Sequence, residues 1–169
     1  MRPRKTCRPT RCPDEFARHA SGRSRNAPGR PTVAAAVEDI SRLLMDDATT
    51  VAVVGATDDP EKYGSVIYRD LKAKGFTVFA VNPNRPRVDG DRAYGSLADL
   101  PEPPTIVTMV VPPPETLRVL HQAEELGLRH VWVQPGAADG AVVDYLAEHG
   151  FTSIVDACIM VRSRYRLPA

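Results

Sequence analysis

The stretch VAVVGATDDPEKYGS, residues 51–65, decides the fold. It begins with a run of apolar, mostly β-branched residues, which leaves no solvated face and is typical of a parallel strand covered by helices on both sides. Gly55 ends this run, and its missing Cβ permits a tight turn and the close approach of a ligand. A polar loop and a helix predicted over residues 65–74 follow. Because a helix start carries unpaired N–H groups and a positive dipole end, this junction favours a phosphate group.

The same turn lacks the two common nucleotide-binding signatures. A dinucleotide fingerprint G-x-G-x-x-G would need glycines where the chain has Thr57 and Pro60. It would also need an acidic residue after the second strand, but the strand predicted over residues 76–81 runs into the sequence NPN at 82–84. The P-loop pattern G-x-x-x-x-G-K-[ST] is absent as well. The sequence therefore predicts an anion-binding turn without identifying its nucleotide.

The rest of the chain repeats the strand–loop–helix unit. Apolar runs predict four further strands, over residues 76–81, 105–111, 130–134 and 152–156. The spacing of apolar residues predicts flanking helices, over residues 33–45, 113–126 and 138–148. Residues 85–104 are interpreted as a polar, turn-rich connection that holds one short helix at 96–100. This alternation predicts an α/β, Rossmann-like fold, a doubly wound open parallel sheet of about five strands with helices on both faces.

Charge is distributed unevenly along the chain. Residues 1–30 hold nine of the 22 basic and two of the 21 acidic residues, a net charge of +7, which leaves −6 on the remainder. An acidic domain argues against nucleic acid as its ligand. Residues 1–31 are rich in Arg, Pro, Gly and Ser and are predicted to form a disordered basic extension, with the folded domain over residues 32–169. Contact of this extension with RNA, an acidic partner or a membrane surface remains the alternative.

Cysteine content and hydropathy bear on the cellular location. The three cysteines make no disulfide framework for a chain of 169 residues. No apolar run reaches the roughly 18 residues that a membrane span requires, and the first residues lack the apolar segment of a secretory signal. The expectation is a reduced, cytoplasmic protein without a membrane partner.

Six short motifs at the predicted strand ends follow one another along the chain. They are VVGATDDP at 53–60 followed by Tyr63-Gly64, VNPN at 81–84, YGSLADLP at 94–101, VPPPE at 111–115, VWVQPG at 131–136 and DAC at 156–158. Together they resemble the small bacterial CoA-binding proteins, whose Rossmann-like domain is related to the CoA-binding domain of the succinyl-CoA synthetase alpha subunit. The resemblance covers about residues 51–161. Thr57, Pro135 and Ala157 depart from the family pattern, and the last two leave details of the pantetheine side open.

The resemblance implies a site for CoA or acyl-CoA at these strand ends. N–H groups of the first turn and of the following helix start would hold the pyrophosphate, and the second strand end would border the adenine. The third strand end would form an apolar wall, and the fourth would line the pantetheine arm. The implied binding residues are Gly55, Ala56, Thr57, Asp58, Lys62, Tyr63, Gly64, Asn82, Pro83, Asn84, Val111, Pro112, Gln134, Pro135 and Gly136. Lys62, Arg85 and Arg87 are the nearest cations for the 3′-phosphate, although each also fits an ordinary surface charge.

Catalytic residues are not recognisable in the sequence. The histidines show no metal-binding spacing and are interpreted as structural or solvent-exposed. The phosphorylated histidine of the synthetases belongs to a second domain, so ligase activity by this chain alone is not expected. Cys158 follows the last predicted strand. Its thiol either forms a mixed disulfide with CoA or is that of a small buried cysteine.

The predicted function is non-enzymatic binding of CoA or acyl-CoA, as a carrier, a sensor or a subunit of an acyl-CoA system with a partner enzyme subunit. An NAD(P)-dependent oxidoreductase or regulator on the same fold is one alternative, against which the missing glycines and acidic residue count. A protein-interaction scaffold with a vestigial pocket is the other. Neither the acyl group nor the oligomeric state is predicted.

Overall fold

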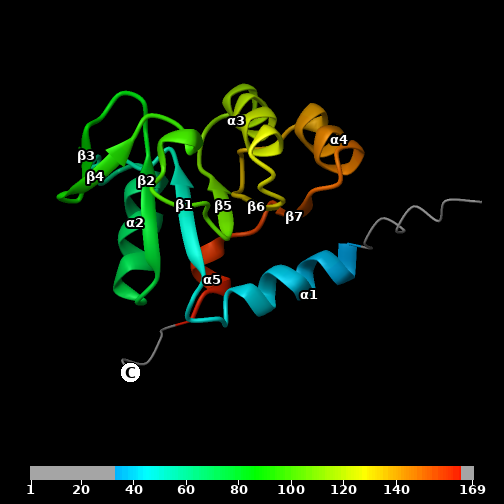
Figure 1. The fold of residues 1–169 in the computed structure, drawn as a ribbon, viewed down its shortest axis with the longest axis horizontal. Coiled ribbons are helices and arrows are strands. Elements are labelled where there is room, and N and C mark those ends of the chain that lie inside the picture. Colours follow the sequence, from blue (N-terminus) through cyan, green and yellow to red (C-terminus); the bar gives the residue numbers. More distant parts are fainter. Residues whose placement is uncertain (1–32, 165–169) are drawn as a thin grey trace, which may run out of the picture.

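The computed structural model describes residues 33–164, with side chains from residue 38 onward. The predicted extension over residues 1–31 lies outside the described residues. The strands are β1 (Thr50–Val54), β2 (Thr77–Val81), β3 (Arg87–Val88), β4 (Asp91–Tyr94), β5 (Ile106–Met109), β6 (His130–Val133) and β7 (Thr152–Val155). They form one sheet in the order β3-β4-β2-β1-β5-β6-β7, which confirms the Rossmann-like α/β prediction (Figure 1). Every pairing in it is parallel except that of β3 with β4.

The sequence analysis predicted about five strands and missed two, β3 and β4, which form a short hairpin. Residues 85–104 were expected to be a turn-rich connection, but they contain both of these strands before the 3-10 helix η1 (Leu97–Asp99). Asp89 and Gly90 form the two-residue hairpin loop with φ values of 50° and 81°, the left-handed conformation that an Asp-Gly pair favours in a type I′ turn. The sequence does not show an apolar strand pattern here, because Val88 and Ala93 are the only apolar residues of the two strands that are buried and the residues around the loop are polar.

Helices cover both faces of the sheet. They are α1 (Val33–Leu43), α2 (Tyr63–Ala73), α3 (Pro113–Glu125), α4 (Gly140–Glu148) and α5 (Ile159–Arg162). Buried residues of α1, α2 and α5 pack in one hydrophobic cluster, and those of α3 and α4 pack in a second. The short α5 was not predicted, since four residues cannot show a helical period. None of the helices in residues 33–164 is long and apolar enough to cross a membrane.

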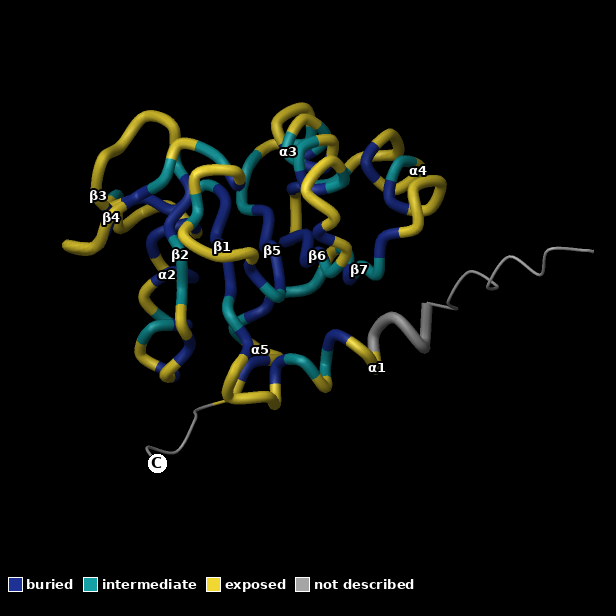
Figure 2. Tube along the Cα trace, in the orientation of Figure 1, coloured by how far each residue is buried: buried dark blue, intermediate teal, exposed yellow. Residues whose placement is uncertain are grey.

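The strands supply alternate side chains to the two hydrophobic clusters. In β1, Val51 and Val53 face the cluster with α1 and α2, whereas Ala52 and Val54 face the cluster with α3 and α4. Figure 2 shows the central strands as buried and the connections at their ends as mostly exposed. Trp132 in β6 is fully buried. Apolar residues on both faces explain why these strands read as continuous hydrophobic runs, and they leave the strand ends as the places for polar chemistry.

Candidate functional site

The turn after β1 lies where the strand order reverses. β1 pairs with β2 on one side and with β5 on the other. The chain leaves β1 through α2 on one face of the sheet and later leaves β5 through α3 on the opposite face. In open parallel sheets this reversal opens a crevice at the carboxyl ends of the strands, where ligands bind. The sequence prediction therefore put its anion-binding turn at the topological switch point.

Two glycines bring the start of α2 against this turn. Gly55 has a φ of 95°, and a Cβ built on it would lie 2.8 Å from Cγ1 of Val111. A Cβ on Gly64 would lie only 2.0 Å from the carbonyl oxygen of Gly55. Since no other residue lacks a Cβ, glycine at 64 is what lets the helix approach the turn this closely.

The first turn of α2 is suited to an anion. The helix begins at Tyr63, two residues before the predicted start, and no side chain caps it at Lys62. The first N–H groups of a helix lack intrahelical carbonyl partners, and the helix dipole is positive there. The N–H of Ser65 donates to the carbonyl of Lys62 at 3.0 Å, so Tyr63 and Gly64 are the first-turn residues whose N–H groups could bind an anion. The earlier start places these donors beside Gly55 rather than one half-turn away.

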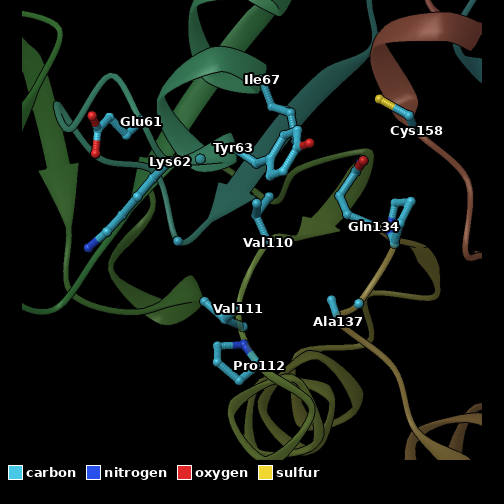
Figure 3. Close-up of a pocket in the computed structure, with 14 residues that line it drawn as sticks. Glu61, Lys62, Tyr63, Ile67, Val110, Val111, Pro112, Gln134, Ala137 and Cys158 are labelled. Atoms are coloured by element: carbon cyan, nitrogen blue, oxygen red, sulfur yellow. The ribbon is translucent and has the colours of Figure 1, made fainter.

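A first cleft of about 690 Å³ opens beside α2 and the ends of β5, β6 and β7. Nine of the predicted binding residues line it, namely Gly55, Lys62, Tyr63, Gly64, Val111, Pro112, Gln134, Pro135 and Gly136. The prediction missed Glu61, Ile67, Val110 and Ala137, which lie next to these motifs or one helical turn away. Figure 3 shows the side chains of Tyr63 and Gln134 pointing into this space from opposite walls.

A second cleft of about 780 Å³ lies on the side of α3, and Gly55 and Val111 border both clefts. Asn82, Pro83 and Asn84 line it, as a site beside the second strand end requires. Its opposite wall was not predicted and consists of Glu115, Arg118, Val119, His121, Gln122 and Glu125 of α3. Their spacing of three and four residues marks one face of a helix, and that polar face is the signal in the sequence that could have found them.

Three predicted residues, Ala56 to Asp58, line neither cleft. Ala56 is fully buried, and its carbonyl accepts a hydrogen bond of 2.7 Å from Nδ2 of Asn82. Asp58 accepts a hydrogen bond of 2.6 Å from the N–H of Asp89 in the hairpin loop. The side-chain amide of Asn82 therefore holds the turn in place, and the fully buried Ala56 can offer a ligand only its backbone.

The cations proposed for a phosphate differ in their surroundings. Lys62 lines the first cleft, with its Nζ 3.6 Å from Asp59. Arg85 lies 3.7 Å from a carboxylate oxygen of Asp58 and lines neither cleft, and Arg87 donates to the carbonyl of Gly90 at 2.9 Å. Arg118, which the sequence analysis did not select, lines the second cleft. Of the three predicted cations, Lys62 is the one that the structure brings to a cleft.

The inner end of the first cleft is held by a dense set of hydrogen bonds. Gln134 donates through Nε2 to Oγ1 of Thr108 at 3.0 Å, and its Oε1 accepts from the N–H of Ile159 at 3.4 Å. Nε1 of Trp132 donates to the carbonyl of Ala157 at 2.7 Å. These bonds fix Cys158, which is partly exposed and lines the cleft. The expectation of a small buried cysteine is therefore wrong, while a disulfide with CoA stays a hypothesis.

Two of the histidines join α3 to α4 through a polar cluster. The Tyr145 hydroxyl donates to Glu124 and lies 3.0 Å from Nδ1 of His121, and the Tyr145 ring stacks on that of His149 at 3.9 Å. Burial and the neighbouring Glu124 carboxylate raise the pKa of Tyr145 to about 12. His149 approaches Glu124 to 3.0 Å. In the part of the chain that the structure describes, no three His, Cys, Asp or Glu side chains gather as a metal site.

A doubly wound sheet with a glycine turn at its switch point and a cleft on either side defines the class of Rossmann-like ligand-binding domains. The chain belongs to the CoA binding domain family, whose model matches residues 49–164. The family that the sequence motifs resemble is thereby confirmed at the level of a CoA-binding domain.

Relatives of this chain include both short proteins and parts of ligases. It is 26% identical over 118 residues to the uncharacterized protein YneT of Bacillus subtilis, covering 70% of this chain and 87% of YneT. It is 33% identical over 82 residues to the alpha subunit of ADP-forming acetate–CoA ligase II of Pyrococcus furiosus, and the match covers 48% of this chain but 18% of that subunit. A conserved hypothetical protein from Pyrococcus furiosus has a similar solved structure, with 38% identity, a TM-score of 0.66, and coverage of 68% of this chain and 99% of that one.

Proposed function

We propose that this protein binds CoA or acyl-CoA across the turn after β1 and carries, senses or presents it without transforming it. The observation that supports the proposal is the pair of clefts that meet at Gly55 and Val111, beside the uncapped start of α2. CoA has the matching layout, because its pyrophosphate lies between a nucleoside and a long, mostly uncharged arm. Each cleft is of the size of a drug-sized ligand pocket, roughly 300–1,000 Å³.

The proposed orientation assigns one part of the ligand to each place. The pyrophosphate lies on the backbone N–H groups of the Gly55 turn and the first residues of α2, with Lys62 as a nearby positive charge. The adenosine half occupies the second cleft beside Asn82, Pro83 and Asn84. The pantetheine arm follows Val111 and Pro112 through the first cleft and ends near residues 134–136.

A role inside a larger acyl-CoA system is also proposed. The ligase relative is named as the alpha subunit of a larger enzyme, and the match covers 18% of the length of that subunit. An activity of that whole subunit is therefore not proposed for this chain alone. The protein would either hold CoA by itself or supply the CoA site to a partner enzyme subunit. Cytoplasmic location and the domain boundary at residue 32 stay predictions.

The test is calorimetric titration of the purified protein, freed of any bound ligand, with CoA, NAD and NADP. A dissociation constant in the micromolar range or tighter, about −8 kcal/mol of binding free energy, is expected for CoA alone. Preference for NAD or NADP would replace the proposal with the oxidoreductase alternative. Binding of none of the three would favour the scaffold alternative.

A charge variant locates the ligand. Lys62→Gln is expected to weaken CoA binding about two- to fivefold, because an exposed ion contact contributes roughly 0.3–1 kcal/mol. Arg42→Gln is the matched control, since Arg42 is an exposed cation on α1 that lines neither cleft. Gly55 is left unchanged, because a side chain there would collide with Val111 and disturb the turn itself. Equal affinities of the two variants would place the phosphates elsewhere.

A further inference from the structure

We propose that the acyl group carried on the CoA thiol is uncharged and apolar, and that Tyr63 is the residue that recognises it. The inference rests on the proposed function, because it concerns the inner end of the same cleft. It names the ligand class as thioesters of monocarboxylic acids with an apolar chain, as opposed to free CoA or to thioesters of dicarboxylic acids.

The charges of the first cleft lie at one side only. Among the described residues that line it, Glu61 and Lys62 alone carry charged side chains. Figure 3 shows these two on the opposite side of the cleft from Gln134 and Cys158, where the end of the pantetheine arm is proposed to lie. An acyl carboxylate at that end would lose its hydration without gaining a cation, which costs several kcal/mol unless water follows it in.

The inner end offers apolar contacts instead. Ile67 and Ala137 are almost completely buried behind the cleft wall, and Val110 and Pro135 add further apolar surface. The side-chain amide of Gln134, which lines the same part of the cleft, already bonds to Thr108 and to the backbone of Ile159. An apolar chain would therefore gain contacts here without displacing any hydrogen bond of the protein.

Tyr63 offers the first cleft a large, exposed aromatic surface. Its ring is 74% exposed although it stands at the wall of the cleft. Figure 3 shows it next to Ile67 and Val110, pointing across the cleft toward Gln134. The backbone at this position is placed by the next residue, Gly64, which lies against Gly55. An exposed aromatic ring here suits an apolar chain, because covering it removes a large apolar surface from water.

The first measurement is a titration series with CoA, acetyl-CoA, butyryl-CoA, hexanoyl-CoA and succinyl-CoA. Butyryl and succinyl groups differ only by a terminal methyl against a carboxylate, so they form a matched pair. Affinity is expected to rise up to about fourfold for each methylene that becomes buried. Butyryl-CoA is expected to bind about tenfold or more tightly than succinyl-CoA, because the carboxylate finds no cation.

The outcomes separate the two proposals. Binding of CoA with equal affinity for all thioesters, or with preference for succinyl-CoA, would overturn the acyl inference and leave the CoA site intact. Failure of every member of the series to bind would overturn both. A rise in affinity along the apolar series together with weak succinyl-CoA binding would support both.

Variants at Tyr63 test the recognition. Tyr63→Ala is expected to weaken hexanoyl-CoA about tenfold and free CoA less than about threefold, since the lost ring contacts the chain and not the phosphates. Tyr63→Phe is expected to retain hexanoyl-CoA affinity. Met45→Ala is the control, because Met45 is an exposed apolar residue that lines neither cleft. An equal loss for CoA and hexanoyl-CoA in a folded Tyr63→Ala protein would show that Tyr63 does not read the chain.

Discussion

Gly64 is the residue whose packing against Gly55 places the start of α2 beside the proposed site. Its Cα faces the carbonyl of Gly55, and an added Cβ would come within 2.0 Å of that oxygen. Because both partners are backbone, neither can swing away, and α2 would have to move off the turn. Gly64→Ala is therefore expected to lower the free energy of unfolding by about 2 kcal/mol or more, in the upper part of the roughly 1–3 kcal/mol typical of overpacked sites. Urea denaturation monitored by circular dichroism measures it.

Gly140 provides the matched control for this substitution. It too lies in the first turn of a helix, but a Cβ built on it meets no atom within 4 Å. Gly140→Ala is expected to be neutral or to stabilise the protein by up to about 1 kcal/mol, because alanine restricts the unfolded chain. Similar losses in the two variants would mean that the contact of Gly64 with Gly55 does not govern the position of α2.

The sequence could predict both glycines as site residues but not the contact between them. Gly55 interrupts an apolar run, which is a local signal, whereas the contact with Gly64 depends on how α2 enters against the sheet. The same holds for Asn82, which was predicted at the ligand and does line the second cleft. Its hydrogen bond to Ala56 joins residues 26 positions apart and was not foreseeable from spacing.

At the scale of elements, α2 is fastened to the β3–β4 hairpin by charges. Lys72 bonds both Asp89 and Asp91, and Tyr68 donates to Asp91 at 2.8 Å. Hydrogen bonds from Lys72 are the main reason that the pKa values of both aspartates lie below 3.8. A carboxylate with a lowered folded-state pKa stabilises the protein above its unfolded-state pKa, about 3.9, and this stabilisation is lost as the pH falls through the folded-state value.

Lys72→Met tests these ion pairs and keeps an unbranched apolar stem, but it also removes the Nζ that lies 5.4 Å from the centroid of the Tyr68 ring. Because the groups are partly exposed, the variant is expected to lose only about 0.5–1 kcal/mol of unfolding free energy at pH 7. The difference from the wild type is expected to begin to shrink below about pH 4, where the unfolded chain takes up protons, and to vanish as the pH falls through the lowered folded-state pKa values of Asp89 and Asp91. Urea denaturation at pH 7 and pH 3 measures it, with Arg42→Gln as the exposed-pair control. A loss of equal size at both pH values would assign the effect to packing.

The elements differ in how much of them the sequence reveals. The five strands β1, β2, β5, β6 and β7 were predictable because each contains a run of mostly apolar residues, and β1, β5 and β6 are buried along almost their whole length. The hairpin was missed because β3 has two residues and only one of them is buried. The wall that α3 contributes to the second cleft was missed for another reason, since its polar residues resemble any solvated helix face until the strand order places them opposite Asn82.

At the scale of the whole molecule, α1 extends the domain beyond the family match, which begins at residue 49. Ile40 and Leu44 are 0% and 3% exposed and belong to the cluster beneath the sheet. A chain that begins at residue 48 would lack both side chains. Its free energy of unfolding is expected to fall by about 1.5–3 kcal/mol for each buried side chain that is lost. That is a large part of the roughly 5–15 kcal/mol by which a domain is stable.

A chain that begins at residue 32 is expected to match the full chain in urea denaturation and in CoA titration. If the chain that begins at residue 48 unfolds with the same free energy as the full chain, α1 does not contribute to the stability of the domain. If the chain that begins at residue 32 is less stable than the full chain, the domain boundary lies within the first 31 residues.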